Sequence, residues 1–291
     1  MTLILPQRGR IRQAAAAGGA LDADIDAGNI TAIWSTRLVN PDYTGFGVRI
    51  RRNSDNARDS FGFDGNGDLD IGGIATFLGG GAGTVSAWFT QVGSADVSVE
   101  GSYPAYDASI AAFNSKPGIV YPGSGAGYHD TLSAVNLDDY FATDQGTLLA
   151  VLRQHSSSAR NTIFRHAQSS THQIILHADY DGTIYWDFGG NTSSHRTSVS
   201  SPGGWDDNPH AVACWRTTAG VQAIEIDGSI TSETGKSART SGQSAVIEIG
   251  GYISSANVHQ GPAVEIVIAK TDLGSSVRAA WLAEVNEYWG L

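Results

Sequence analysis

Four oxygen-bearing side chains recur at every second position in the segment Asp64-Gly-Asn66-Gly-Asp68-Leu-Asp70. This spacing suits a calcium loop, because calcium is a hard cation that prefers six or more oxygen ligands around one point. An EF-hand would also need glycine at the sixth position and glutamate at the twelfth, where the chain has Leu69 and Ala75. The EF-hand is therefore excluded. Two interpretations remain: a looser calcium site, or a solvated turn of Asp and Asn residues, which the sequence favours.

A pair of carboxylates occurs at Glu225-Ile-Asp227, in a segment whose alternation predicts a strand. Sandwich-type glucanases carry a third acid two or three residues further on, and two carboxylates are needed to cleave a glycosidic bond. The corresponding positions hold Ser229 and Ile230, and Asp227-Gly228 is a strong hairpin signal. The carboxylate motif is incomplete, so we predict no catalytic residue and expect the chain not to be an enzyme.

The histidines form no recognisable catalytic or metal-binding motif. No pair combines His-x-x-x-His spacing with a carboxylate, and His172 and His177 lie an odd number of residues apart, on opposite faces of a strand. No Gly-x-Ser-x-Gly or cysteine-based nucleophile motif is present either. We expect surface or loop histidines at positions 129, 155, 166, 172, 177, 195, 210 and 259.

Aromatic residues gather in the second half of the chain, close to Asp and Asn residues that could bind sugar hydroxyls. Sandwich cores also need large aromatic side chains, and we assign Trp215 and one of Tyr185 and Trp186 to the core. Trp205 lies in a Gly-Trp-Asp-Asp segment typical of a loop, and it is the best candidate for a ligand platform. The predicted ligand-binding residues are Trp205, Asp206, Asp207, Asn208 and Tyr185.

The chain of 291 residues has a formal net charge of −11. An acidic surface repels phosphate backbones, which argues against nucleic acid as a partner. The exception is the N-terminus, where Arg8, Arg10 and Arg12 precede the first acidic residue, Asp22. This segment is either a basic arm that docks on an acidic partner or a solvated tail.

The single cysteine, Cys214, excludes an intrachain disulfide and lies in an apolar run, so we expect a small buried side chain. The chain therefore needs no oxidising compartment to fold. Leu3–Leu5 is too short for the apolar part of a secretion signal, and no segment is long enough to span a bilayer. We expect folding in the cytoplasm and no membrane span.

The first half of the chain predicts short, mixed elements. We expect an extended arm over residues 1–29, helices over Ile30–Leu38 and Asp70–Leu78, and strands over Gly47–Arg51, Val85–Phe89 and Ile119–Tyr121. The first helix should end before Asn40-Pro41, because a residue that precedes proline avoids the helical region.

From Gly146 onwards, short strands recur at intervals of roughly 8–12 residues and are separated by glycine-containing turns, a pattern that predicts a β-sandwich or barrel. A helix near Ser275–Trp289, capped by Thr271 or Asp272, should close the chain. Its apolar stripe is Val277, Trp281, Leu282, Val285 and Trp289. The predicted strands cover 147–152, 162–164, 173–178, 183–188, 210–215, 221–226, 245–249 and 263–269.

Residues 146–291 resemble the laminin-G-like form of the concanavalin-A-like lectin/glucanase superfamily, as found on phage and secreted bacterial proteins. The matching segments are 146–153, 203–207, Glu225-Ile-Asp-Gly-Ser229, Ile247-Glu-Ile-Gly-Gly251 and the ending Trp281-Leu-Ala-Glu-Val-Asn-Glu-Tyr-Trp-Gly-Leu291. Asn114-Ser-Lys-Pro-Gly-Ile-Val-Tyr121 is similar to the strand that usually opens this module, which places its start near residue 110.

Residues 30–95 resemble the start of arabinofuranosidase-B-type domains, a block that recurs in phage tail and head-appendage proteins. The resemblance is carried by Tyr43-Thr-Gly-Phe-Gly-Val-Arg-Ile-Arg-Arg-Asn-Ser-Asp-Asn56 and Phe63-Asp-Gly-Asn-Gly-Asp-Leu-Asp70. The family's Tyr-Asp-Gln-Ser-Gly motif corresponds to Phe89-Thr-Gln-Val-Gly93, which lacks its aspartate and serine. No catalytic acid of that family can be matched, so the resemblance implies a scaffold.

We therefore expect an all-β fold: a concanavalin-A-like jelly-roll β-sandwich over 110–291, a small α+β block over 30–109, an extended anchoring arm over 1–29 and a C-terminal helix. The expected function is that of a structural virion protein, on a head spike, a fibre or a tail of a phage or phage-like particle. The arm would dock on other virion proteins through Arg8, Arg10 and Arg12, and the sandwich would bind host polysaccharide.

We expect a homo-oligomer that is assembled in the host cytoplasm. No cofactor is predicted, apart from the calcium considered for Asp64, Asn66, Asp68 and Asp70. The alternatives are a glycoside hydrolase related to arabinofuranosidases and a free carbohydrate-binding module.

Overall fold

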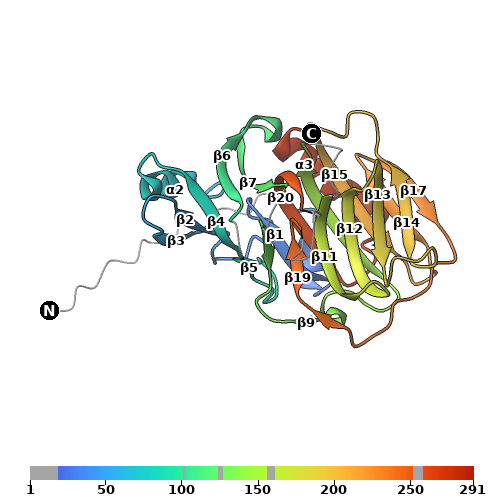
Figure 1. The fold of residues 1–291 in the computed structure, drawn as a ribbon. Coiled ribbons are helices and arrows are strands. Elements are labelled where there is room, and N and C mark those ends of the chain that lie inside the picture. The colour runs from blue at the N-terminus through green and yellow to red at the C-terminus, as the bar shows by residue number, and fades with distance from the viewer. Residues whose placement is uncertain (1–18, 101–102, 124–126, 156–160, 252–257) are drawn as a thin grey trace.

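The computed structural model describes residues 19–100, 103–123, 127–155, 161–251 and 258–291 (Figure 1). These residues form mostly antiparallel strands, with the helices α1 (Asp22–Asp26), α2 (Ile71–Leu78) and α3 (Gly274–Trp289). The predicted all-β sandwich with a C-terminal helix is therefore confirmed. Among the helices of this described part, none combines the length and the apolar character needed to cross a membrane.

The strands are β1 (Ile30–Ser35), β2 (Val48–Arg52), β3 (Arg58–Phe61), β4 (Gly83–Trp88), β5 (Val97–Glu100), β6 (Ala105–Ile110), β7 (Lys116–Pro122), β8 (Tyr128–Asp130), β9 (Val135–Asn136), β10 (Gly146–Arg153), β11 (Asn161–Ser169), β12 (His172–Asp179), β13 (Thr183–Phe188), β14 (Arg196–Ser200), β15 (Pro209–Arg216), β16 (Gln222–Ile226), β17 (Ser229–Glu233), β18 (Ser244–Ala245), β19 (Ile247–Ile249) and β20 (Gln260–Ala269). Short 3-10 turns lie at Ala111–Phe113 and Leu137–Asp139.

Two layers of antiparallel strands form the sandwich. The first sheet has the order β17-β16-β15-β10-β20-β1. The second has the order β14-β13-β12-β11-β19-β8-β5-β4-β2-β3. The hairpin of β6 and β7 connects them, because β7 pairs with β20 and β6 with β4. In Figure 1, β2, β3 and β4 lie at the left of the view, and β13, β14 and β17 lie at the right.

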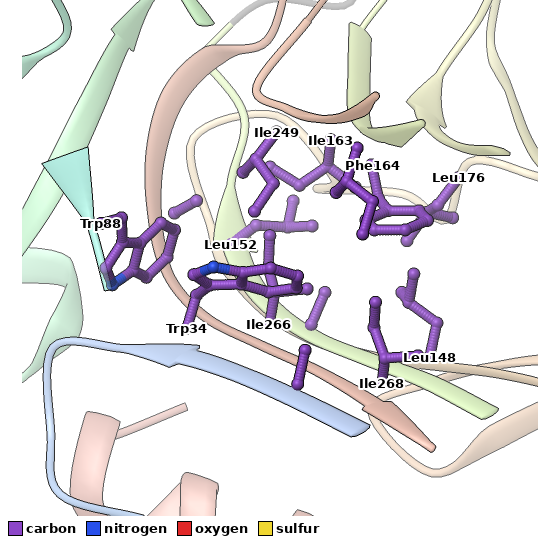
Figure 2. Packing of buried hydrophobic residues seen from close by; sticks show 14 of the residues in the cluster. Trp34, Trp88, Leu148, Leu152, Ile163, Phe164, Leu176, Ile249, Ile266 and Ile268 are labelled. Atoms are coloured by element: carbon purple, nitrogen blue, oxygen red, sulfur yellow. The ribbon is translucent and has the colours of Figure 1, made fainter. Parts of the chain in front are cut away.

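The main core lies between the two sheets. Figure 2 shows Leu148 of β10 and Ile266 of β20 in the same cluster as Phe164 of β11 and Leu176 of β12. Because side chains alternate along a strand, every second residue enters this core. Each such side chain stabilises the fold by roughly 1.5–3 kcal/mol relative to exposure.

A second core lies on the other side of the first sheet, where α3 packs. Trp281, Val285 and Trp289 of the helix share a hydrophobic cluster with Leu149 and Val151 of β10. The first sheet is therefore apolar on both faces. The outer face of β12 and β13 in the second sheet carries polar side chains instead.

Two predictions from the sequence are wrong, one within the first 38 residues and one at the last helix. The predicted helix over Ile30–Leu38 is strand β1, and its apolar residues fill both faces of a buried strand, with Ile33 in the outer core and Trp34 in the inner one. The described part of the arm contains α1. The N-cap position of α3 is held by Leu273, without a side-chain cap bond. Asp272 accepts from the N–H of Gly274 at 3.1 Å.

The segment over 30–109 is built into the sandwich. Strand β1 pairs with β20, and β5 pairs with β8. Trp34 and Trp88 lie in the same hydrophobic cluster as Leu148. The boundary that the sequence placed between 109 and 110 therefore does not divide the core.

Candidate functional site

The outer face of β12 and β13 holds a buried carboxylate. Strand alternation turns Ile174 and Leu176 inward and directs Gln173 and Asp187 outward. Arg196 of β14 binds the two carboxylate oxygens of Asp187 at 2.5 and 2.7 Å, and Gln173 donates to one of them at 2.6 Å. Burial raises the pKa of Asp187, and the Arg196 guanidinium opposes that rise. Both oxygens are thus engaged by a cation.

Other groups on this sheet are also paired. Glu248 of β19 is buried and forms an ion pair with Arg165 of β11. His177 of β12 shares a 2.9 Å hydrogen bond with the Thr162 hydroxyl. Burial lowers the pKa of His177 to about 3, so the ring is neutral near neutral pH. The ion pairs and the neutral histidine on this face therefore join neighbouring strands of the sheet and serve the structure.

The aromatic platform predicted at Trp205 is not present. Trp205 is only 2% exposed and stacks on His210, with ring centroids 4.4 Å apart. Its indole N–H donates to the Gln154 side chain at 3.4 Å. Tyr185, which was predicted to bind the same ligand, lies on the outer face of β13 under the Arg196 guanidinium, 4.4 Å from its ring centre. The two rings therefore face different regions.

The Gln154 side chain holds two carboxylates together at one end of the sandwich. Its Nε2 atom lies 3.2 Å from Oδ2 of Asp179 and 3.4 Å from Oδ1 of Asp206. The N–H of Gly182 donates to the other oxygen of Asp179 at 2.8 Å. Burial raises the pKa of Asp179, and the charge of Asp206 adds to this effect. Asp206 is half-buried in the loop after β14.

The remaining residues of the predicted binding loop point to local partners. Asp207 is exposed, and its Oδ1 atom lies 2.9 Å from Nδ1 of His155 and 3.4 Å from Arg153. These contacts lower the pKa of Asp207, the hydrogen bond with His155 most of all. Asn208 donates to the carbonyl of Gly204 at 2.5 Å and so closes its own loop.

A pocket of about 230 Å³ lies beside this loop, where β14 of the second sheet meets β16 and β17 of the first. His210 and Asp227 supply its charged and polar groups. Nδ1 of His210 is 2.6 Å from Oδ2 of Asp227, and the N–H of Ala211 donates to Oδ1 at 2.9 Å. Nε2 of His210 is buried and has no hydrogen-bond partner among the described residues. The other lining residues are Val199, Ser200, Pro202, Gly203, Ile224, Ile226, Ser229 and Thr231.

Glu225 and Asp227 do not share a cleft. Glu225 is on the face of β16 that meets α3, where its Oε2 atom lies 3.8 Å from Nε of Arg278. The Arg278 guanidinium in turn lies 3.6 Å from the Trp215 ring centre. Asp227 sits at the turn after β16 and faces His210. The incomplete motif predicted from the sequence is therefore not completed by the fold at these two residues.

The acidic loop over 64–70 satisfies its oxygens internally. Asp64 accepts from the backbone N–H groups of Asn66 and Asp68 at 2.8 and 3.1 Å. Asp68 binds Lys116 at 2.9 Å, and Asp70 caps α2. Within the described ranges, no group of three or more His, Cys, Asp or Glu side chains converges to hold a metal. The hydrogen bonds match the interpretation as a turn of Asp and Asn.

Sequence reasoning misplaced most of the histidines. Five of the eight are buried: His129, His166, His177, His210 and His259. Segments distant in the sequence bury them, and a single histidine in a sequence offers no signal of this. One signal for the polar face was available in the sequence. Gln173 and His177 on β12, and Asp187 on β13, occupy the strand positions that alternate with core residues. Arg8, Arg10 and Arg12 lie outside the described residues.

No known family model matches the chain, and no curated protein matches it. Solved structures that share the fold include an arabinofuranosidase complexed with arabinofuranosyl-alpha-1,2-xylobiose, at a TM-score of 0.67 and 17% identity. Another is a GH54 a-l-arabinofuranosidase soaked with a cyclic sulfate inhibitor, at a TM-score of 0.64 and 16% identity. Both matches cover 93% of this chain and 65% of the other. At this identity, the likeness shows that the chain has the β-sandwich fold of these proteins.

Proposed function

We propose that this chain is a non-catalytic saccharide-binding protein and that the pocket between β14, β16 and β17 holds one sugar ring. The observation that carries the proposal is the composition of this pocket. The Asp227 carboxylate has acceptor positions beyond those used by His210 and Ala211, and sugar hydroxyls can donate to them. Ile224 and Ile226 supply apolar surface for the ring.

The size of the pocket supports a single ring. Its 230 Å³ is below the roughly 300–1,000 Å³ of pockets that enclose drug-sized ligands. The hydroxyls of Ser200, Ser229 and Thr231 line it, and each can donate or accept. The fold likeness to a protein complexed with an arabinofuranosyl xylobiose makes a pentose-containing glycan the first ligand to try.

The test is isothermal titration with arabinose, xylose and arabinoxylan fragments. Asp227→Asn should weaken binding at least tenfold, because the variant loses the charged acceptor. Asp207→Asn is the matched control, since Asp207 lies on the neighbouring loop and does not line the pocket. Equal binding by wild type and Asp227→Asn would overturn the proposal.

A glycoside hydrolase is the second candidate, and the Asp179–Asp206 pair favours it. A retaining enzyme needs two carboxyl groups about 5–5.5 Å apart, one of them with a raised pKa. Asp179 and Asp206 bond the same Gln154 nitrogen, and the pKa of Asp179 is raised. Release of nitrophenol from nitrophenyl arabinofuranoside by wild type, abolished in both Asp179→Asn and Asp206→Asn, would replace binding with hydrolysis.

We also propose that the chain is a component of a phage or phage-like particle and works as a homo-oligomer. The support is that residues 30–95 resemble a block that recurs in phage tail and head-appendage proteins, and that residues 146–291 resemble a laminin-G-like domain found on phage and secreted bacterial proteins. Mass spectrometry of purified particles should detect the chain in stoichiometric amounts. Sedimentation should give a mass that is a multiple of 30.5 kDa. A chain absent from particles would contradict this role and leave saccharide binding open.

A further inference from the structure

A surface on the N-terminal sheet concentrates positive charge on a chain whose net charge is −11. Arg49 and Arg51 are two residues apart on β2 and point to the same side, away from the buried Val48 and Ile50. Arg58 of β3 pairs directly opposite Arg51. Three guanidiniums therefore share one face of the β2–β3 ladder, which we name the arginine face.

Aromatic rings hold these guanidiniums in place. Tyr103 stands beside two of them, with its ring centre 4.9 Å from Arg51 and 5.8 Å from Arg58. Its hydroxyl accepts from Arg58 at 2.8 Å. Arg49 lies 5.3 Å from the ring centre of Phe89. Planar guanidiniums stacked on rings keep their N–H groups at the edges, where an anion can reach them.

The arginine face has no acidic partner among the described residues. Arg49 donates to the Ser60 hydroxyl at 3.4 Å, and Arg51 donates to the Asn56 amide oxygen. Asp59 is opposite Ile50 and thus on the other side of the ladder. Like charges directly opposite on a sheet repel each other, so an anion bound between Arg51 and Arg58 would relieve this repulsion.

Arg52 on the same strand has a different role. It points to the other face, where it forms an ion pair with Asp55 at 2.6 Å and donates to the carbonyl of Phe77. Its guanidinium is therefore neutralised within the chain, and it provides a matched control for the neighbouring arginines.

We propose that the arginine face binds an acidic polysaccharide through its carboxylates. Arginine matches a carboxylate with two parallel hydrogen bonds, and charges at intervals of about 7 Å along β2 suit a polymer that carries an acid on successive units. Phe46 is 52% exposed and packs on Phe89, 6.1 Å between ring centroids, which extends the surface with an apolar area. Such a surface can attract an anion although the whole chain is acidic. At physiological salt, the acidic side chains further away than about 8 Å are screened and do not repel the anion.

This surface is separate from the pocket between β14, β16 and β17: β2 and β3 lie at the opposite side of the view in Figure 1. The two proposals therefore fail independently. Asp227→Asn should leave binding at the arginine face unchanged.

The experiment measures binding of the full chain to polygalacturonate, with dextran as the neutral control, by titration at low and at physiological salt. Wild type should bind polygalacturonate only. The double variant Arg51→Gln/Arg58→Gln should lose at least tenfold in affinity, whereas Arg52→Gln should retain wild-type affinity. Circular dichroism should show that both variants are folded.

Three outcomes would overturn the proposal. Equal affinity of wild type and the double variant would show that the arginine face is not the site. Single-stranded DNA binding as tightly as polygalacturonate at equal charge would assign the surface to nucleic acid. A change of oligomeric mass in the double variant, without polygalacturonate binding by wild type, would assign it to contacts between copies of this chain.

Discussion

His210, near the start of β15, and Asp227, at the turn after β16, are joined by a hydrogen bond: Nδ1 of the histidine lies 2.6 Å from Oδ2 of the aspartate. Asp227 has a positive φ of 49° at the hairpin turn, a conformation that asparagine also adopts readily. Asp227→Asn should therefore keep the turn and lose only the charged partner of His210. We expect a cost of about 1 kcal/mol in the free energy of unfolding, since the carboxylate is partly exposed. Urea unfolding would measure it, and a loss above about 4 kcal/mol would show that the turn itself had failed.

Acid should destabilise this protein through its buried histidines. Burial lowers the pKa of His129 and His177 to about 3 and that of His259 to about 4. The unfolded chain, with histidine pKa values near 6.5, then binds more protons than the folded chain. Stability should be complete above about pH 6.5 and should fall below it towards the folded-state values. These three groups give a slope of roughly 4 kcal/mol per pH unit, and His166, whose pKa is also lowered by burial, adds to it.

Urea unfolding between pH 7.5 and pH 5 tests this slope. His259→Gln should reduce the slope by roughly 1.4 kcal/mol per pH unit, because one of the groups is removed. His172→Gln is the control, since His172 is half-buried and accepts or donates only to nearby hydroxyls. A free energy of unfolding that stays constant over this range would contradict the burial of these rings.

Glu265 connects the first sheet to α3. It is fully buried, and its carboxylate accepts from Arg37 at 2.6 and 3.0 Å and from the Trp281 indole at 2.9 Å. Glu265→Gln leaves the Arg37 charge without this buried partner and should cost about 3–5 kcal/mol. Arg37→Met/Glu265→Leu should be closer to wild type, because both members of the buried pair are removed and only the more exposed Glu284 loses its ion-pair partner. Equal loss in both variants in chemical denaturation would mean that packing matters more than charge.

Trp205 should behave as a core residue. Because it is buried against His210, Trp205→Ala should cost about 3–5 kcal/mol of stability. Tyr185→Ala, at a half-buried ring on the other side of the sheet, should cost less. Thermal unfolding compares the two. If Trp205→Ala kept wild-type stability but lost saccharide binding, Trp205 would be a ligand platform and not a core residue.

The sequence predicted the sandwich well because its signals are local. Strands β12 and β15 are short apolar runs followed closely by the glycine turns at Gly182 and Gly220, and α3 has an apolar stripe. The failures share one cause, which is burial by distant segments. The spacing of the apolar residues around Ile33 and Trp34 is compatible with a helix. It is the pairing with β20, which the sequence does not reveal, that makes this segment a strand. Trp205 lies in a loop as predicted, but His210 and Gln154 bury its side chain, which the loop position does not reveal.

The candidate site was less predictable than the fold. Asp227 was considered with Glu225 because of their spacing, whereas the structure pairs it with His210, seventeen residues earlier. The sequence analysis predicted the strand that carries Arg49 and Arg51 but assigned these arginines no role. Their shared face required the register with β3, which brings Arg58 opposite Arg51. Contacts of this kind depend on strand pairing and are not contained in the local pattern.

The pairing of β1 with β20 delays the folding of β1 during synthesis of the chain. The two strands lie near opposite ends of the chain, with Ile30 opposite Ala269. At about 5–20 residues per second, a ribosome needs roughly 10–50 s to produce the second strand after the first. During that time Trp34 and its neighbours have no sheet to join. Completion of the sandwich must therefore wait until β20 has been made, and until then the growing chain has to keep an apolar strand from premature association.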